Sequence, residues 1–396
     1  MRAIRNPQSA IRNCMWQSNK TLWLVYLLAA LVVSLLKLSV GNNPFGYTAY
    51  ENYIIFKNSF SHLLGGQNPY AGYTAEQWDL FKYSPAFALA MAPFALLPDW
   101  LGLQLWNLTN ALLLLGAVLH LPVLDESKRR FMAWFILPEL VVSMQNRQSN
   151  GLTAAFLLWA FIALEKQKPV AAAAWTAAGG FLKIFGIFAA APAMVYPKWS
   201  AFLIALAGWT ALLLLAPLLL VSPEQLWHVY GWWWELLRED HSVSVGRSVP
   251  GWLETWFGWQ APKLGVTLAG MVLLLASVFA VNRQPSTVNR ALLWAGVLIW
   301  VVIFNHKAES PTFVIALSGV ALWYLTDETP ARWKKILFWT AFAFASLSPT
   351  DIFPRFLREQ WVQPYVLKAV PCIFIWFIIT WQLLSQRIFP TKTLAT

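Results

Sequence analysis

Acidic side chains that interrupt apolar stretches are the first candidates for chemistry. Glu51, in AYENYIIFKNSF, stands beside apolar residues that would strip water from its carboxylate. Loss of hydration raises the pKa of a carboxyl group toward that of a useful general base. Asp79, in NPYAGYTAEQWDLFKYSP, is a second candidate, and Glu76 and Lys82 can pair with it or bind a substrate. The alternative for these acids is structural, as a helix cap or part of a solvated loop.

Amide and cationic side chains form a second group, suited to hydroxyl groups and anions. The knot QNRQSNG, residues 145–151, places Asn146, Arg147 and Asn150 between two apolar runs. Amides beside an arginine suit hydroxyl and phosphate recognition, because a guanidinium group binds oxyanions through two parallel hydrogen bonds. Lys183, in GGFLKIFG, is surrounded by apolar residues, which is unfavourable unless its ammonium group reaches water or an anion. The alternatives are a plain loop for the knot and snorkelling for the lysine.

Two later loops carry further polar residues. The loop 222–263 is rich in Trp and also contains Asp240 and His241. Aromatic faces with short polar side chains are typical of surfaces that face carbohydrate, although an interfacial helix would have a similar composition. The segment NHKAESPT places ionisable groups abruptly between two apolar runs, which indicates a functional site at a membrane face, with a short polar turn as the alternative. Its candidate residues are Asn305, His306, Lys307 and Glu309.

The elements that position these residues are membrane-spanning helices. Of the 396 residues, 58% are hydrophobic and only 12% are charged, which excludes an ordinary soluble protein. The run Thr21–Val40 is long enough to cross a bilayer, and similar runs recur to the C-terminus. Strict alternation of apolar and polar residues is absent, so the spans are predicted to be helices rather than barrel strands. The fold class is therefore all-α, a polytopic transmembrane bundle.

Charge bias gives the predicted topology. Length and charge indicate about 11 to 13 spans in one domain, residues 21–386. The basic N-terminal segment leads directly into the first span, which is therefore predicted to be a signal anchor. Basic residues place the tails 1–20 and 387–396 in the cytoplasm. The loops 42–83 and 222–263 are then extracytoplasmic, and Tyr50–Leu64 is predicted to be an amphipathic interfacial helix.

Two segments do not fit simple alternation. If 84–97 and 101–121 both crossed the membrane, the basic segment DESKRR would lie outside, which the charge rule disfavours. We therefore expect this proline-broken pair not to form two full crossings. Similarly, 170–195 is predicted to form two short half-helices that meet near Lys183, which would keep Lys166, Lys168 and Lys198 in the cytoplasm.

Several classes of protein are disfavoured. The net charge of +11 comes from basic residues beside spans, which membrane topology and anionic lipid explain better than nucleic acid. Cys14 and Cys372 lack metal-site spacing, and a disulfide between them is not expected. A Walker-type loop, HExxH, GxSxG and paired CxxC motifs are absent, which argues against ATP-driven transport and against zinc or serine hydrolase chemistry.

Beyond these patterns, about half the chain resembles a known family. The segments ENYIIFKNSFSHLLGGQNPY, FKYSPAFALAMAPFALLPDWLGLQLWNLTNALLLL and QNRQSNGLTAAFLLWAFIALEKQKPVAAAAWTAAGGFLKIFG are similar to glycosyltransferase family 87. NHKAESPTF and SLSPTDIFP look typical of a bacterial branch of it. The resemblance implies a GT-C type membrane fold and inverting transfer of a sugar, mannose by default, from a polyprenyl-phosphate donor. It also implies no metal and no cofactor besides the lipid-linked co-substrate.

The resemblance assigns the catalytic base, and the cations and amides described above supply the other predicted roles. Glu51 matches the catalytic base, although relatives often have Asp there, and Asp79 is the second choice. Cations near the departing phosphate are expected to stabilise its charge. These candidates are Lys183, Arg147, His306 and Lys307. The predicted substrate-binding residues are Asn146, Asn150, Asp240, His241, Asn305 and Glu309. The expected partners are the bilayer, the donor and a glycolipid or glycan acceptor, at the extracytoplasmic face of the cell inner membrane.

Two other functions compete with this interpretation. A transporter or flippase for a lipid-linked saccharide would share Trp-rich loops and broken helices, but it would predict repeat symmetry and polar residues along a whole transmembrane path. The polar clusters instead favour one side of the membrane. A non-catalytic scaffold would not need His306, Lys307 and Glu309 together at a membrane face.

Overall fold

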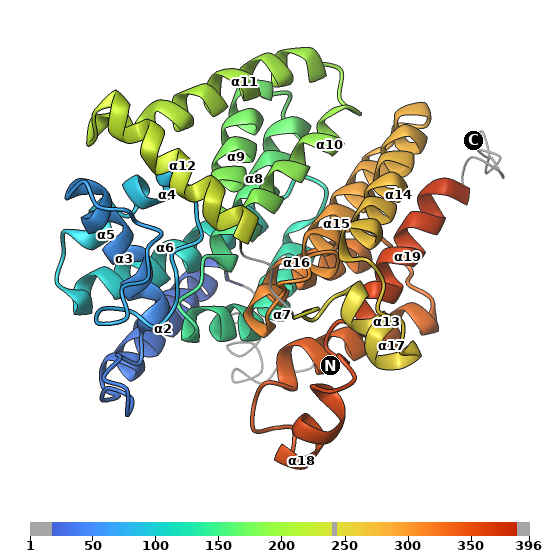
Figure 1. Cartoon of the computed structure of the whole chain (residues 1–396). Coiled ribbons are helices and arrows are strands. Elements are labelled where there is room, and N and C mark those ends of the chain that lie inside the picture. Colours follow the sequence, from blue (N-terminus) through green and yellow to red (C-terminus); the bar gives the residue numbers. More distant parts are fainter. Residues whose placement is uncertain (1–17, 240–243, 386–396) are drawn as a thin grey trace, which may run out of the picture.

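The structure, a computed structural model, describes residues 18–239 and 244–385, and within these ranges it contains helices and no strand. The predicted tails 1–20 and 387–396 lie outside the described residues, apart from residues 18–20, and so does Cys14. The all-α polytopic fold class is confirmed. Figure 1 shows the helices of the first half (blue to green) beside those of the last third (gold to red). Helix α7 packs against α2, α6 and α16, and so joins the two groups.

The helices have the following bounds. The first half contains α2 (Asn19–Leu38), α3 (Glu51–Leu64), α4 (Pro85–Ala90), α5 (Ala92–Ala95), α6 (Asp99–Leu119), α7 (Glu126–Gln145), α8 (Asn150–Glu165), α9 (Pro169–Leu182), η1 (Ile184–Ala189) and α10 (Ala190–Ala193). The middle contains α11 (Trp199–Leu215), η2 (Ala216–Leu219), α12 (Pro223–Glu239) and α13 (Val249–Phe257). The last third contains α14 (Lys263–Arg283), α15 (Thr287–Ile303), η3 (Ser310–Thr312), α16 (Phe313–Leu325), α17 (Arg332–Phe342), η4 (Ala343–Leu347), α18 (Arg355–Leu357), η5 (Arg358–Val362) and α19 (Val370–Ser385).

Helix length and exposure identify the membrane-embedded part of the chain. Among the described residues, four helices are long and apolar enough to cross a bilayer: α2, α6, Trp199–Leu219 and α14. Six shorter apolar helices accompany them, and α15 and α16 are buried along almost their whole length at the centre of the core. By contrast, α11 has a single buried residue, Phe202, and its exposed apolar side chains suit a helix that faces lipid. The estimate of 11 to 13 spans stays a prediction.

The predicted amphipathic helix of the first long loop is confirmed as α3, which begins at Glu51. Its apolar face buries Tyr53, Phe56, Phe60 and Leu63, which recur at the three- and four-residue spacing of one helix face. On the same helix, Lys57 Nζ lies 2.5 Å from Asp99 Oδ1, so α3 contacts the start of α6. The intervening helices α4 and α5 are too short to cross a membrane, so only α6 of this pair has the length to do so, which agrees with the expectation that 84–97 and 101–121 do not form two full crossings.

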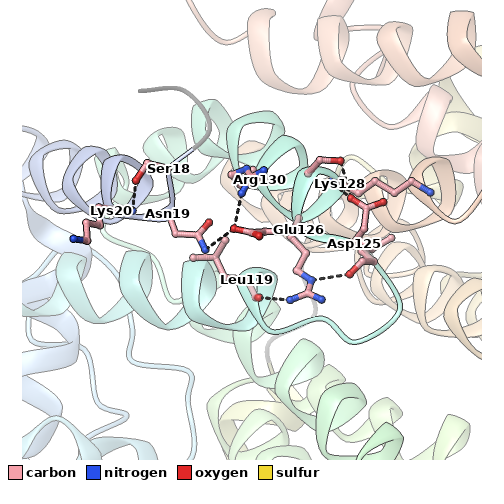
Figure 2. A network of polar contacts seen from close by, with 11 residues as sticks. Ser18, Asn19, Lys20, Leu119, Asp125, Glu126, Lys128 and Arg130 are labelled. Atoms are coloured by element: carbon pink, nitrogen blue, oxygen red, sulfur yellow. Dashed lines mark hydrogen bonds and ion pairs between the residues drawn. The ribbon is translucent and has the colours of Figure 1, made fainter. Parts of the chain in front are cut away.

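The start of α7 lies beside the start of α2 (Figure 2). Asn19 Nδ2 donates to Glu126 Oε1 at 3.3 Å, and the same carboxylate oxygen accepts from Arg130 at 2.5 Å. Lys128 pairs with Glu328 at 2.7 Å in the loop before α17. The basic segment DESKRR therefore shares one end of the bundle with the basic start of α2, as the charge rule favours.

The broken segment around Lys183 is a re-entrant hairpin, as predicted. Helix α9 ends at Leu182 and η1 begins at Ile184, so Lys183 lies at the tip. A Cβ atom on Gly186 would lie 2.2 Å from the carbonyl carbon of Gly179, so only glycine allows the two arms to pack this closely. After α10, Tyr196 Oη donates to Glu165 Oε1 at 2.7 Å, at the end of α8. The hairpin thus returns to the end from which it entered.

Candidate functional site

A cavity of about 370 Å³ lies where α3, the segment before α4, the tip of the Lys183 hairpin, α12 and the loop before η3 meet. One wall is apolar and includes Phe56, Phe181, Phe185, Trp233 and Leu237. The polar side chains that line it are Asn52, Asp79, Lys82, Ser84, Gln148, Lys183, Asn305, His306, Lys307, Glu309 and Thr312. The cavity therefore combines an apolar surface with a cluster of ionisable groups.

The structure brings together six of the twelve candidate residues in this lining. These are Asp79, Lys183, Asn305, His306, Lys307 and Glu309. Asn150 lies directly behind the lining, in contact with Lys183. Glu51, Arg147 and Asn146 lie next to the cavity but do not line it. Asp240 and His241 lie outside the described residues. Segments far apart in the sequence, from Asn52 to Thr312, thus meet at one site.

A chain of hydrogen bonds crosses the back of the cavity from Lys183 to Glu309. Lys183 Nζ donates to Asn150 Oδ1 at 2.5 Å, and Asn150 Nδ2 donates to Gln148 Oε1 at 2.6 Å. Gln148 Nε2 then donates to Glu309 Oε2 at 2.6 Å. This series of hydrogen bonds begins at an ammonium group, which can only donate, and ends at a carboxylate, which can only accept. The orientation of the two amide groups between them is therefore defined. Gln148 belongs to the polar knot, but it was not among the candidates.

Asp79 and Lys82 lie in the lining close to α4. Asp79 Oδ2 lies 3.1 Å from Lys82 Nζ, and both side chains are 39% exposed. The other oxygen, Asp79 Oδ1, accepts from the backbone N–H of Leu80 at 2.8 Å, which fixes the carboxylate in its turn. Ser84 Oγ donates to the carbonyl of Phe181 at 2.6 Å and so ties this segment to the Lys183 hairpin. The pairing of Asp79 with Lys82 was one of the outcomes expected from the sequence.

Glu51 and Arg147 form a second charged group beside the cavity. Glu51 Oε1 accepts from Asn43 Nδ2 at 3.0 Å. Partial burial raises the pKa of Glu51 above its ordinary value, and the positive charge of Arg147 opposes that rise. Burial lowers the pKa of Arg147 to about 10, and Glu51 acts in the opposite direction. Asn52, the next residue of α3, lines the cavity and donates to the carbonyl of Asn146 at 2.8 Å.

Asn146 is placed differently from its predicted role. Its side-chain Nδ2 donates to the carbonyl of Val142 at 2.8 Å, so the amide caps the last turn of α7. Arg147 follows with φ of 53°, in the left-handed region, and its carbonyl accepts from Trp106 Nε1 at 3.0 Å. This turn redirects the chain from α7 toward Gln148 and the cavity.

The loop that carries Asn305 to Glu309 is held by the described part of the second long loop. The N–H of Arg247 donates to the carbonyl of Ala308 at 2.9 Å. Gly246 has φ of +59°, and a Cβ atom there would lie 2.4 Å from the carbonyl oxygen of His306. Burial lowers the pKa of Arg247, whereas the carboxylates of Glu309 and Glu139 act to raise it. Arg247 therefore adds a positive charge behind the cavity, close to Glu309.

The charges around the cavity are unequal. The lining carries three lysines, Lys82, Lys183 and Lys307, against the two carboxylates of Asp79 and Glu309. Within residues 18–239 and 244–385, groups of three or more His, Cys, Asp or Glu side chains that could hold a metal ion are absent. A lining with an excess of cations beside an apolar wall suits an amphipathic anion.

The fold and the cavity define a class of protein: an all-α polytopic membrane protein with a cationic cavity at one end of its helices. Residues 81–304, more than half of the chain, match the profile of glycosyltransferase family 87, and the chain belongs to that family. The protein is therefore a membrane glycosyltransferase. The matched range contains Arg147 and Lys183 and ends just before Asn305. A search of curated proteins found no match.

Proposed function

We propose that this glycosyltransferase moves a hexose, with mannose as the first candidate, from a polyprenyl-phosphate donor to a glycolipid or glycan acceptor. The observation that carries the proposal is the cavity in which Lys183, Lys307 and Asp79 face the same space as an apolar wall. Such a space suits a lipid phosphate at its cationic side and an isoprenoid chain along the apolar side chains. The reaction uses no metal and no nucleotide sugar.

The position of the cavity along α7 supports an extracytoplasmic site in the cell inner membrane. The N-terminal end of α7 lies beside the basic start of α2, and the cavity residue Gln148 follows its C-terminal end. A helix of 20 residues is about 30 Å long, which is the thickness of the hydrocarbon core. If the basic end is cytoplasmic, as positive residues favour, the cavity opens on the other face.

The proposed reaction is a single displacement with inversion. Glu51, or Asp79 as the second candidate, takes the proton of an acceptor hydroxyl, and the oxygen attacks the anomeric carbon. The bond from that carbon to the phosphate oxygen breaks, and polyprenyl phosphate leaves from the opposite face. Lys183, Lys307, His306 and Arg147 stabilise the negative charge that grows on the leaving phosphate. Asn305, Glu309 and Asn150 orient the hydroxyl groups of the sugar and the acceptor. The same role is proposed for Asp240 and His241, which lie outside the described residues.

Purified protein in lipid nanodiscs tests this function. With a polyprenyl-phosphate [³H]mannose donor and octyl α-mannoside as acceptor, we expect a radiolabelled disaccharide whose new linkage has the anomeric configuration opposite to that of the donor. Activity should persist in EDTA. Transfer from a nucleotide sugar, but not from the lipid donor, would contradict the proposed donor. Movement of the lipid-linked sugar across proteoliposomes without any transfer would instead establish the competing flippase function.

The charge of Arg147 predicts a specific pH effect. Burial raises the pKa of Glu51 and Arg147 lowers it, so Arg147→Gln should raise that pKa further. A general base must be ionised, and the acidic limb of kcat/KM should therefore move to higher pH in this variant. Arg147→Lys, which keeps the charge, is the matched control and should leave the limb near its wild-type position. An unchanged limb in Arg147→Gln would show that Glu51 does not control the pH profile.

A further inference from the structure

A buried ion pair lies behind the cavity and outside the reaction proposed above. Glu139 on α7 and Lys368, just before α19, are 2.8 Å apart, and their side chains are 0% and 2% exposed. The two residues are 229 positions apart in the sequence. Replacing a buried ion pair by apolar residues of similar volume is often neutral or stabilising, because the pair must overcome the desolvation of both charges. Stability alone therefore explains this pair poorly.

The second hydrogen bond of Lys368 points to another role. Lys368 Nζ donates to Ser310 Oγ at 2.8 Å. Ser310 is the first residue of η3 and directly follows Glu309, a residue of the cavity lining. The lysine thus connects a fully buried carboxylate to the backbone that carries a carboxylate of the cavity.

Glu309 is held from two further sides. Its backbone N–H donates to Thr312 Oγ1 at 3.3 Å, within a capping box that spans η3. Its side-chain Oε2 accepts from Gln148 at 2.6 Å, at the end of the chain that begins at Lys183. Rotation or displacement of η3 would therefore change the distance from Glu309 to Gln148. Among the described side-chain hydrogen bonds of η3, the one that links it to a distant element is the bond from Lys368 Nζ to Ser310 Oγ.

Arg247 makes the electrostatic environment of Glu309 sensitive to the Glu139–Lys368 ion pair. It lies close enough to interact electrostatically with both Glu139 and Glu309. When the ammonium group of Lys368 neutralises the carboxylate of Glu139, the guanidinium group of Arg247 interacts mainly with Glu309. An unbalanced Glu139 would compete for the same guanidinium group, because opposite charges attract strongly where water is excluded.

We propose that Lys368, held by Glu139, is a positioning residue that fixes η3 through Ser310 and so sets the orientation of the Glu309 carboxylate in the cavity. Neither Lys368 nor Glu139 lines the cavity. This inference rests on the proposed sugar transfer for its kinetic readout, but its structural readout is independent of that function.

The Ser310→Ala variant tests the anchor while leaving the buried ion pair in place. We expect kcat for mannose transfer from the polyprenyl-phosphate donor to fall about tenfold, with little change in the donor KM or in thermal stability, because small misplacements of substrate-orienting groups are costly. Ser310→Thr, which keeps a hydroxyl, should restore most of the rate. Ser318→Ala is the matched control: Ser318 is buried in α16 and donates within its own helix, to the carbonyl of Val314.

Two further measurements separate positioning from folding. Hydrogen exchange of residues 305–312 should be faster in Ser310→Ala than in wild type or Ser318→Ala, whether or not transfer is observed. The double variant Glu139→Leu/Lys368→Met removes both charges together, and we expect it to fold and to be as slow as Ser310→Ala. Wild-type kcat in Ser310→Ala, or in a folded double variant, would overturn the proposal. Unchanged exchange in 305–312 would also overturn it, whereas absent transfer by the wild-type protein would contradict only the proposed function.

Discussion

Replacement of Lys183 by methionine is expected to lower kcat for sugar transfer by about 100- to 1,000-fold, the usual effect of removing one group that stabilises developing negative charge. Lys183 lies at the tip of a re-entrant hairpin and lines the cavity. Methionine keeps most of the length of the side chain but removes its positive charge. The leaving phosphate would then gain its charge in a poorly hydrated site with one fewer cation, which raises the energy of the transition state.

Steady-state kinetics in nanodiscs with the polyprenyl-phosphate mannose donor measure this effect. Lys168→Met is a matched control, because Lys168 lies exposed at the other end of α9 and should tolerate the change. Lys183→Arg keeps the charge but alters the contact with Asn150 Oδ1, so we expect an intermediate rate. A Lys183→Met protein with wild-type kcat and normal thermal stability would exclude Lys183 from stabilising the leaving group.

The topology around Lys183 could be predicted because charges are costly in a membrane. Lys166 and Lys168 precede the segment and Lys198 follows it, so one crossing would have separated basic residues that prefer the same face. A hairpin avoids this conflict, and the structure contains one. The same reasoning predicted that 84–97 and 101–121 would not form two full crossings, and α4 and α5 are indeed too short to span a bilayer. In both cases a global electrostatic rule compensated for weak local signals.

The direction in which individual side chains point was less predictable. On α3, residues 52, 55 and 56 line the cavity, whereas Glu51 does not. Neighbouring helix positions differ by about 100° in direction, and a sequence pattern locates the start of a helix only to within a few residues. Asn146 shows a related effect, because its amide is used to cap α7 rather than to face the cavity. An amide suited to binding sugar is equally suited to ending a helix.

The long-range partners were not predictable from the sequence. Glu139 stands within the apolar run 131–144, which indicates that it needs a buried partner, but nothing nearby supplies one. Lys368, its partner, is separated from it by most of the chain. Gln148 was overlooked for a similar reason: its importance comes from Glu309, 161 positions later, and not from its own neighbours. Such contacts depend on how helices pack, which spacing along one helix does not specify.

The choice of the catalytic base gives the second large effect. If Glu51 is the base, Glu51→Gln should lower kcat by about 100- to 10,000-fold while the protein still folds, because glutamine keeps the shape of the side chain but cannot accept the proton. Partial burial has already raised the pKa of Glu51, which suits this role. Asp79→Asn should then have a smaller effect, about tenfold, through loss of the contact with Lys82 at 3.1 Å.

The relative size of the two effects decides the assignment. Asp79 lines the cavity, so a much larger loss in Asp79→Asn than in Glu51→Gln would make Asp79 the base and reduce Glu51 to a partner of Arg147. Glu224→Gln, on the exposed start of α12, is the control for an acid-to-amide change outside the cavity. The pH profile gives an independent check, since loss of the true base should abolish the acidic limb of the remaining activity. Wild-type rates in both Glu51→Gln and Asp79→Asn would contradict a carboxylate base at either position.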